Sequence, residues 1–153
     1  MSLLPQHDLQ WRHISPFVLD WRIDNSVIDH YGHVNNVAYL SKIEALAWAH
    51  SNDLGLTVQQ YQQIDRGMVI KRHEIDYILP CHVEQTIACA TWIVDCDGKL
   101  SLTREFEFIC RQRQRVVFSA RTEFVCIALS SGAPKRMPTI FKNTYGAAVV
   151  ERQ

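Results

Sequence analysis

The feature that most constrains the fold is a succession of strand-like segments in the second half of the chain. Between residues 67 and 129 the sequence is rich in β-branched and aromatic residues and divides into four runs. These runs are Met68–Leu79, Val83–Asp95, Leu100–Arg111 and Val116–Leu129. Asp97-Gly98 is a hairpin signal, and the polar residues 111–115 mark another turn. Because strands joined by such short turns pair side by side in opposite directions, the segment predicts an antiparallel sheet.

The first half of the chain adds one strand and one long helix. Phe17–Asp24 alternates apolar and polar residues, which is typical of a half-buried strand. Val37–His50 instead carries apolar residues at helical spacing, and Gly55 should cap the end of this helix. The apolar positions are Leu40, Ile43, Leu46 and Ala47. Because a sheet with an apolar face needs a covering layer, this helix should cover the five-stranded sheet in an α+β fold.

The remaining segments are predicted to be short or irregular. Leu56–Arg66 is polar and rich in glutamine, and we interpret it as a short helix or a lid. From Ser130 onwards the run Ser-Ser-Gly-Ala-Pro and then Pro138 interrupt any regular pattern, so the C-terminal tail is expected to be irregular. With 153 residues and no linker or internal repeat, residues 1–153 are expected to form a single domain with its core at about residues 16–129.

Composition argues against several classes of function. The chain has 16 basic and 16 acidic residues and therefore lacks the basic excess expected of a nucleic-acid-binding protein. No run approaches the roughly 18 consecutive apolar residues of a membrane span. Residues 1–15 also lack the apolar core of a secretion signal, so a cytoplasmic location is expected. The cysteine count of 5 is odd and no Cys-x-x-Cys pair occurs, which argues against disulfides and a zinc site.

The most informative local pattern is the stretch from Asp29 to Tyr39, between the predicted strand and the predicted helix. Gly32 can adopt a positive φ and turn the chain, and Asn35 or Asn36 can cap the helix. This arrangement brings the Asp29 carboxylate close to free amide groups at a helix N-terminus, where an oxyanion can be held. Acyl transfer requires both groups. A simpler interpretation, in which a turn aspartate precedes an ordinary cap, accounts for the spacing equally well.

A family resemblance favours the functional interpretation. The run Asp-x-x-Gly-His-Val-Asn-Asn-x-x-Tyr, followed by Glu44, resembles the signature of the 4-hydroxybenzoyl-CoA thioesterase family of hotdog-fold acyl-CoA thioesterases. Tyr77 and Pro80 resemble the second strand of that family, and a looser resemblance covers most of the chain. One position departs, because Val27 stands where many members carry a second acidic residue. The resemblance implies a hotdog fold, in which long antiparallel strands wrap a central helix.

The same resemblance implies an activity and a set of site residues. The expected activity is hydrolysis of acyl-CoA thioesters, with no cofactor other than the coenzyme A of the substrate. The family site lies at a subunit interface, so a homodimer or homotetramer is expected. The implied catalytic residues are Asp29, Gly32, His33 and Asn36. The candidates for substrate binding are Asn35, Tyr39, Glu44 and Arg72.

Alternatives to this site come from other side chains. Glu44 falls about two turns into the helix, where a related branch of hotdog thioesterases carries its catalytic carboxylate; otherwise it is a structural acid of the dimer. Asp29, His30 and His33 could suggest a metal site, but three ligands across one tight turn rarely point at one ion. A Ser-His-Asp site is disfavoured, because no Gly-x-Ser-x-Gly elbow precedes a helix.

Further alternatives concern the residues that could bind phosphate groups and the functions other than hydrolysis. Arginine and lysine side chains that could bind the phosphates of coenzyme A are Lys71, Arg72, Arg111, Arg113 and Arg115. The arginines at residues 111–115 could equally form a solvated hairpin tip. The alternative to hydrolysis is a hotdog domain that binds acyl-CoA or another acyl ligand without turnover. A hydratase or dehydratase on the same fold would need a histidine placed for proton abstraction.

Overall fold

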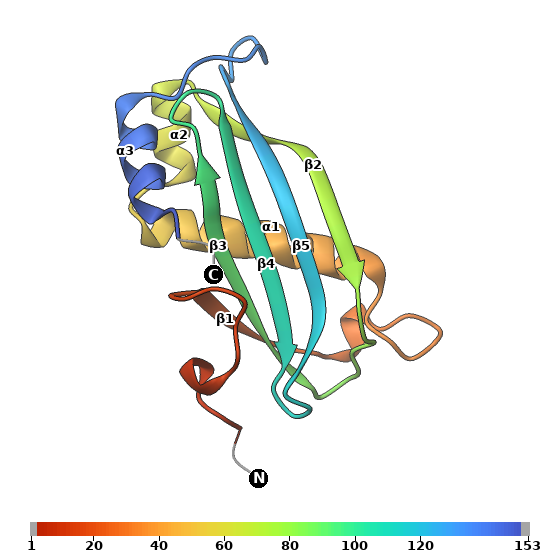
Figure 1. Cartoon of the computed structure of the whole chain (residues 1–153). Coiled ribbons are helices and arrows are strands. Elements are labelled where there is room, and N and C mark those ends of the chain that lie inside the picture. The colour runs from red at the N-terminus through yellow and green to blue at the C-terminus, as the bar shows by residue number, and fades with distance from the viewer. Residues whose placement is uncertain (1–2, 151–153) are drawn as a thin grey trace.

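The computed structural model describes residues 3–150, and its centre is a five-stranded sheet crossed by a long helix (Figure 1). The strands are β1 (Phe17–Arg22), β2 (Gly67–Tyr77), β3 (Thr86–Cys96), β4 (Ser101–Cys110) and β5 (Arg115–Ile127). They are ordered β1-β3-β4-β5-β2, and every neighbouring pair is antiparallel. The five predicted strands are therefore confirmed, and β1 and β2 form the edges of the sheet.

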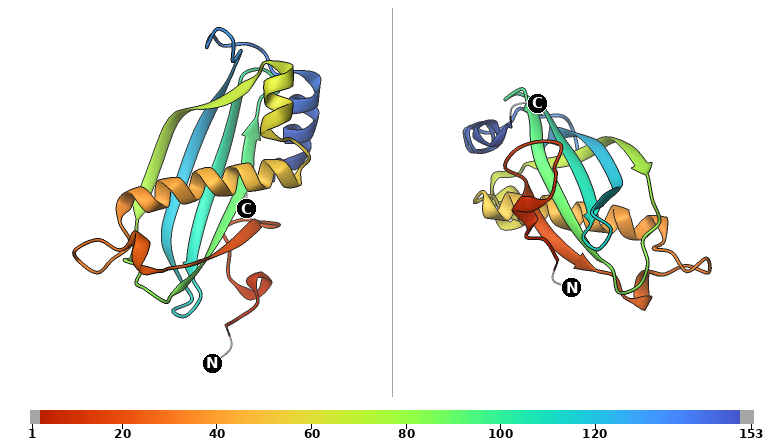
Figure 2. Two further views of the ribbon diagram at one scale, coloured as in Figure 1. Left: turned by 180° about the vertical axis from the view of Figure 1, so that it is seen from behind. Right: turned by 60° about the horizontal axis from the view of Figure 1, so that its bottom comes forward.

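The long helix α1 (Asn36–Asp53) covers one face of this sheet (Figure 2, left). Its residues Ile43 and Leu46 are buried against Phe106 and Phe108 of β4 and other side chains of the sheet. Gly55 follows the helix with a φ of +96°, a conformation that favours glycine, as predicted for the C-terminal cap. The antiparallel sheet wrapped around this helix confirms the predicted α+β hotdog architecture.

Two shorter helices lie together at one end of the sheet (Figure 1). The first, α2 (Val58–Ile64), confirms the short helix predicted after α1. The second, α3 (Thr139–Ala148), corrects the prediction of an irregular C-terminal tail. Pro138 stands just before α3 at the N-cap position, where a proline does not interrupt a helix, and Phe141 and Tyr145 are spaced by four so that both are buried on one helical face.

The face of the sheet opposite α1 is partly covered by the segment that precedes β1. Trp11 packs edge-on against Trp92 of β3, and the Trp92 indole donates to the Ile14 carbonyl at 2.9 Å. On the same face Glu105 of β4 pairs with Arg121 of β5 at 2.8 Å. The short 3-10 helices of the chain are Gln6–Asp8 and Asn25–Val27. The two faces of the sheet therefore differ, because the face opposite α1 carries ion pairs and the face under α1 carries most of the core.

All five cysteines are free thiols, and most of them are buried. Cys96 is half-buried, and the other cysteines are buried among apolar side chains or inside the sheet. None of the helices within residues 3–150 is long and apolar enough to cross a membrane.

Candidate active site

The turn that contains Asp29 is held together by the carboxylate of that residue. Asp29 Oδ1 accepts hydrogen bonds from the backbone N–H groups of Tyr31 at 2.8 Å and His33 at 3.3 Å. The Asp29 N–H donates to the His33 carbonyl at 2.8 Å, and Gly32 turns the chain with a φ of +78°. Within residues 3–150 no hydrogen bond engages Asp29 Oδ2. One oxygen of this half-buried carboxylate is therefore fixed and the other is available.

Directly after the turn, α1 begins with unpaired N–H groups. Asn35 is the cap, because its Oδ1 accepts from the Ala38 N–H and its Nδ2 donates to the Val27 carbonyl, both at 2.9 Å. In the described part of the chain the N–H groups of Asn36 and Val37 have no acceptor. The partial positive charge of a helix is concentrated at such groups, so this helix start can hold an oxyanion.

Two further predicted substrate-binding residues have different surroundings from this helix start. Tyr39 is only 3% exposed, and its ring stacks on Phe118 and meets the edge of Trp21 in the core. Its position on the apolar face of α1 explains this burial, and the substrate contact of Tyr39 stays a prediction. Arg72 lies on β2, where it pairs with Glu74 at 2.9 Å while both side chains remain largely exposed.

The structure also places the residues that were considered for metal binding and for phosphate binding. Residues 3–150 contain no group of three His, Cys, Asp or Glu side chains arranged to hold a metal ion. The His33 ring lies against the ring of His82, with centroids 5.0 Å apart. Arg111 pairs with Asp20 at 2.6 Å. The neighbouring Arg113 donates to a backbone carbonyl at 2.7 Å, so both guanidinium groups already have protein acceptors.

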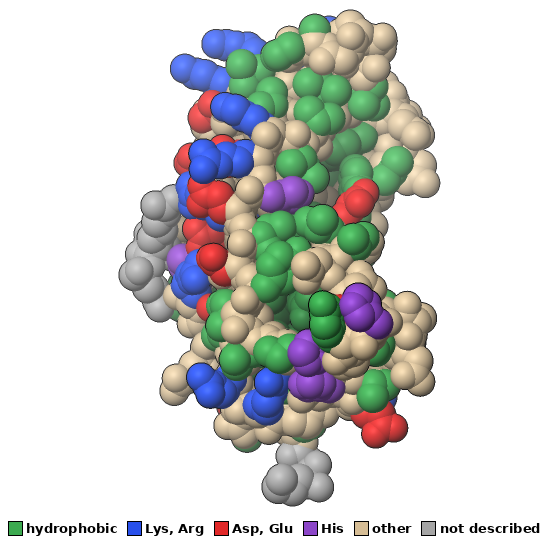
Figure 3. All heavy atoms as spheres, turned by 90° about the vertical axis from the view of Figure 1, so that its right-hand side faces the viewer, with side chains coloured by type: hydrophobic (Ala, Val, Ile, Leu, Met, Phe, Trp, Pro, Cys, Tyr) green, Lys and Arg blue, Asp and Glu red, His purple; other side chains and the backbone are tan. Residues whose placement is uncertain are grey.

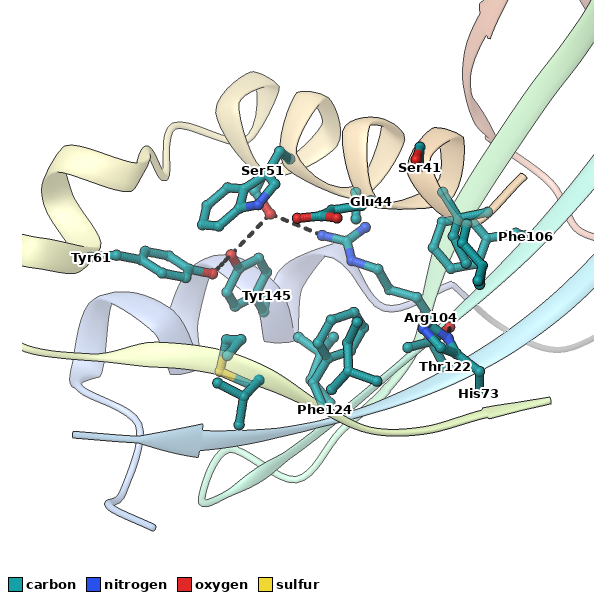
Figure 4. Close-up of a pocket in the computed structure, with 18 residues that line it drawn as sticks. Ser41, Glu44, Ser51, Tyr61, His73, Arg104, Phe106, Thr122, Phe124 and Tyr145 are labelled. Atoms are coloured by element: carbon teal, nitrogen blue, oxygen red, sulfur yellow. Dashed lines mark hydrogen bonds between the residues drawn. The ribbon is translucent and has the colours of Figure 1, made fainter. Parts of the chain in front are cut away.

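A cavity of about 490 Å³ lies between α1 and the β2 side of the sheet (Figure 4). α1 lines it from Leu40 to Ser51, and Ile70, Phe106 and other apolar side chains of the sheet line the opposite wall. Leu40 lies one helical turn after Asn36, which is roughly 6 Å along the helix axis. The cavity therefore begins close to the unpaired N–H groups.

Among the predicted site residues, Glu44 alone lines this cavity. Its side chain is exposed and forms no ion pair within residues 3–150. Figure 4 shows the Glu44 side chain extending from α1 toward the guanidinium of Arg104. The structure thus separates the predicted residues into a turn with Asp29 at the start of α1 and a carboxylate inside the cavity.

The cavity also contains a buried polar cluster, which we call the Arg104 cluster. Arg104 of β4 is 3% exposed and donates to His50 Nδ1 at 2.8 Å and to Ser51 Oγ at 3.0 Å. Ser51 Oγ lies 3.0 Å from the Tyr145 hydroxyl, which in turn contacts the Tyr61 hydroxyl. No carboxylate of residues 3–150 forms an ion pair with Arg104. Side chains from α1, α2, α3 and β4 therefore meet around one cation.

Burial controls protonation in the Arg104 cluster. Burial and the adjacent guanidinium lower the pKa of His50 to about 4, so its ring is neutral and Nδ1 can accept a hydrogen bond. Burial lowers the pKa of Arg104 to about 10, which still leaves the guanidinium charged at neutral pH. Burial raises the pKa of Tyr61 far above its ordinary value. The cluster is therefore a single cation among neutral partners.

The Arg104 cluster was missed by sequence reasoning, although one signal points to it. Arg104 alternates with Leu102 and Phe106, so it stands on the apolar face of its strand. A charged residue on the same strand face as apolar residues indicates a buried ion. In the sheet Arg104 is opposite Thr122 of β5, which is opposite His73 of β2 and bonds to it at 2.8 Å. These partners come from distant segments and leave no local pattern.

The chain is similar to known thioesterases in sequence profile and in structure. The profile of the thioesterase-like superfamily matches residues 24–144. None of the curated proteins matches the chain significantly. A DHNA-CoA thioesterase from Staphylococcus aureus has a TM-score of 0.78 at 13% identity, with 86% of this chain and 89% of that chain covered.

Two further solved structures are similar to the chain. A 1,4-dihydroxy-2-naphthoyl-CoA thioesterase from Synechocystis has a TM-score of 0.76 at 16% identity, covering 86% of this chain and 96% of that chain. A hypothetical protein from Staphylococcus aureus in complex with CoA has a TM-score of 0.81 at 13% identity, covering 91% of this chain and 89% of that chain. At these identities the likeness to solved structures establishes the shared fold.

Proposed function

Because this chain belongs to the thioesterase-like superfamily, we propose that it hydrolyses acyl-CoA thioesters to the free acid and coenzyme A. The observation that supports this most directly is that the unpaired N–H groups of Asn36 and Val37 lie between the Asp29 turn and the start of the cavity at Leu40. A thioester at the helix start would direct its carbonyl oxygen at these N–H groups and its acyl group into the apolar cavity. The complex of a similar structure with CoA supports coenzyme A as the carrier.

The proposed role of Asp29 is to attack the thioester carbonyl carbon or to activate water. In the first route a carboxylate oxygen bonds to that carbon, the C–S bond breaks, coenzyme A leaves as a thiolate, and water then hydrolyses the mixed anhydride. In the second route Asp29 takes a proton from a water whose oxygen forms the new C–O bond as the C–S bond breaks, and the thiolate is protonated. Both routes need a carboxylate oxygen that is free to reach the thioester or a water, and within residues 3–150 Asp29 Oδ2 has no hydrogen-bond donor.

Glu44 is the second candidate for this role, because it lines the cavity and Asp29 does not. We place Asp29 first for a geometric reason. A carbonyl beside Glu44 would lie two helical turns beyond Asn36, roughly 12 Å along the axis, and could not reach the N–H groups at the helix start. Hydrolysis at Glu44 would therefore need a different group to stabilise the oxyanion.

We also propose that the chain forms a homodimer through β2. This strand is an uncovered edge of the sheet, and apolar side chains gather on this side of the molecule (Figure 3). The exposed apolar residues near this edge are Val69, Ile70, Tyr77 and Ile78. Pairing with a second copy would satisfy the free backbone groups of β2 and cover these side chains. Since β2 also lines the cavity, the second copy would lie close to the proposed site; pairing of two dimers would give the tetramer.

The experiment that tests the activity is a hydrolysis assay over a panel of acyl-CoAs, with release of the free thiol as the readout. We expect measurable turnover with at least one acyl-CoA and its loss in the Asp29→Asn variant. If no acyl-CoA is hydrolysed while calorimetry shows that one binds, the hydrolysis proposal fails and the non-catalytic acyl-CoA-binding function replaces it.

A further inference from the structure

We propose that the acyl group of the substrate ends in a carboxylate, and that Arg104 binds this carboxylate at the inner end of the cavity. This inference rests on the proposed function and deepens it, because it specifies which acyl-CoAs the site accepts. The feature that carries it is a buried guanidinium that faces the cavity and forms no ion pair in the described chain, although the Glu44 side chain extends toward it (Figure 4).

Within the described chain Arg104 lacks a compensating negative charge. Burying a cation costs free energy unless an anion is close to it, so buried arginines are usually paired with carboxylates. Arg104 has neutral partners only, His50 and Ser51. Glu44 lines the same cavity but forms no ion pair with Arg104, and the adjacent Glu105 pairs with Arg121 on the opposite face of the sheet. An anion brought in by the ligand would supply the missing charge.

Arg104 also has hydrogen-bond donors that no described residue uses. A guanidinium has five N–H donors in a fixed planar arrangement that matches the two oxygens of a carboxylate. In residues 3–150 two of these donors are used, one for His50 and one for Ser51. The remaining donors of Arg104 can therefore hold a ligand carboxylate, and the hydroxyl of Tyr145, next to Ser51, is a further neighbour of the same position.

The proposed thioester position and the Arg104 cluster lie at different places along α1. The proposed thioester position lies at Asn36 in the first turn of α1, whereas His50 and Ser51 lie toward its other end. Asn36 and Ser51 are about 22 Å apart along the helix axis. The α1 side of the cavity between them is apolar except at Ser41 and Glu44. An extended acyl chain with a thioester at one end and a carboxylate at the other matches this order of polar, apolar and cationic surroundings.

A purely structural role for Arg104 makes a different prediction. Arg104 joins β4 to α1, and through Ser51 to Tyr145 of α3, so its loss would also loosen the packing of these elements. Such loosening would lower the rates with all acyl-CoAs by a similar factor. Binding of a terminal carboxylate would instead change the ratio between substrates, which is the quantity to measure.

The test compares matched pairs of acyl-CoAs of equal chain length, of which one ends in a carboxylate and the other in a methyl group. Wild type is expected to show a kcat/KM about tenfold or more higher for the carboxylate-ended member at its preferred length. Arg104→Met should abolish this preference, and Arg104→Lys should retain part of it. Arg121→Met removes an arginine from the opposite face of the sheet and should leave the preference unchanged.

Each result decides the inference separately from the activity. Equal or better hydrolysis of the methyl-ended member at every length, or an equal loss on both members in Arg104→Met, overturns the inference while thioester hydrolysis stands. If no acyl-CoA is hydrolysed, calorimetry with the same pairs decides: tighter binding of the carboxylate-ended member that depends on Arg104 supports the inference, and equal binding overturns it. Arg104→Gln keeps a donor for Ser51 and replaces Arg104→Met if that variant does not fold.

Discussion

The two ends of α1 present opposite environments to the same cavity wall. At the first turn, unpaired N–H groups and the Asp29 carboxylate lie in a half-exposed turn formed by consecutive residues. Toward the last turn, the Arg104 cluster is buried and draws side chains from four elements, with Ser51 and Tyr145 separated by 94 residues. The first end offers an anion next to hydrogen-bond donors, which suits bond cleavage, and the second offers a cation among neutral groups, which suits recognition.

This difference separates chemistry from selectivity in the proposed enzyme. Changes at the first turn should lower turnover with every acyl-CoA, whereas changes at the Arg104 cluster should alter the choice of acyl group or the stability of the fold. The predictions below test this division, beginning with the largest expected effect.

Asp29→Asn should cause the largest loss of activity. Asparagine keeps the Oδ1 acceptor for the N–H groups of Tyr31 and His33 but supplies neither nucleophile nor base, so turnover should fall about a hundredfold or more with acyl-CoA binding largely kept. Initial-rate assays of thiol release measure this fall in turnover. Glu44→Gln is the matched control and should lose less activity. Near wild-type activity of Asp29→Asn together with an inactive Glu44→Gln would show that Glu44, and not Asp29, is the catalytic carboxylate.

Asn36→Pro should lower turnover on the order of a hundredfold, because it removes one N–H donor of the proposed oxyanion site. The fold should tolerate proline here, since it becomes the first residue of α1 and follows Asn35, whose ψ of 152° is compatible with a following proline. Asn36→Ala keeps the N–H group and should retain measurable activity. Equal kcat values for the two variants would show that the Asn36 N–H group does not stabilise the oxyanion.

Ile70→Lys should weaken the proposed homodimer about tenfold or more, because it introduces a charge on an edge strand at a side chain that is 49% exposed. Light scattering at micromolar concentration gives the mass. Ile140→Lys, at an exposed isoleucine of α3, is the matched control and should leave the mass unchanged. A monomeric wild type under these conditions would contradict the dimer.

His50→Gln should have the smallest effect, on the pH dependence of stability. In the folded chain the pKa of His50 is lowered to about 4, so between pH 6.5 and 4 the unfolded chain binds a proton that the folded chain does not. His50 therefore makes stability fall as the pH is lowered through this range, by about 1 to 2 kcal/mol given its partial exposure. Urea unfolding at pH 7 and pH 4.5 should show a smaller decrease for His50→Gln than for wild type.

The fold could be predicted largely from local patterns. The five strands, the helical spacing of Ile43 and Leu46, and the turn at Gly32 were predicted from short segments, and all were confirmed. The tail helix was missed because Pro138 was interpreted as a breaker when it precedes the first turn of α3. The superfamily match supports the thioesterase resemblance at the level of the superfamily, and the 4-hydroxybenzoyl-CoA branch stays a prediction.

The candidate site divides in the same way. The Asp29 turn and the Asn35 cap are contained in one short stretch, so their geometry follows from the sequence. The Arg104 cluster depends on strand order and on the position of α3, which no local pattern specifies. Tyr39 lies four residues before Ile43, and this helical spacing places its side chain in the core.

The strand order described above has a consequence for how the chain acquires its structure during synthesis. β1, α1 and β2 leave the ribosome first, yet β1 must wait for β3 and β2 must wait for β5, the last strand made. The β3-β4-β5 meander can form early because its strands are consecutive, whereas the edges close long loops. The apolar face of α1 therefore lacks most of its partners until the second half of the chain emerges, and we expect this interval to be the period in which the nascent protein is most prone to aggregation.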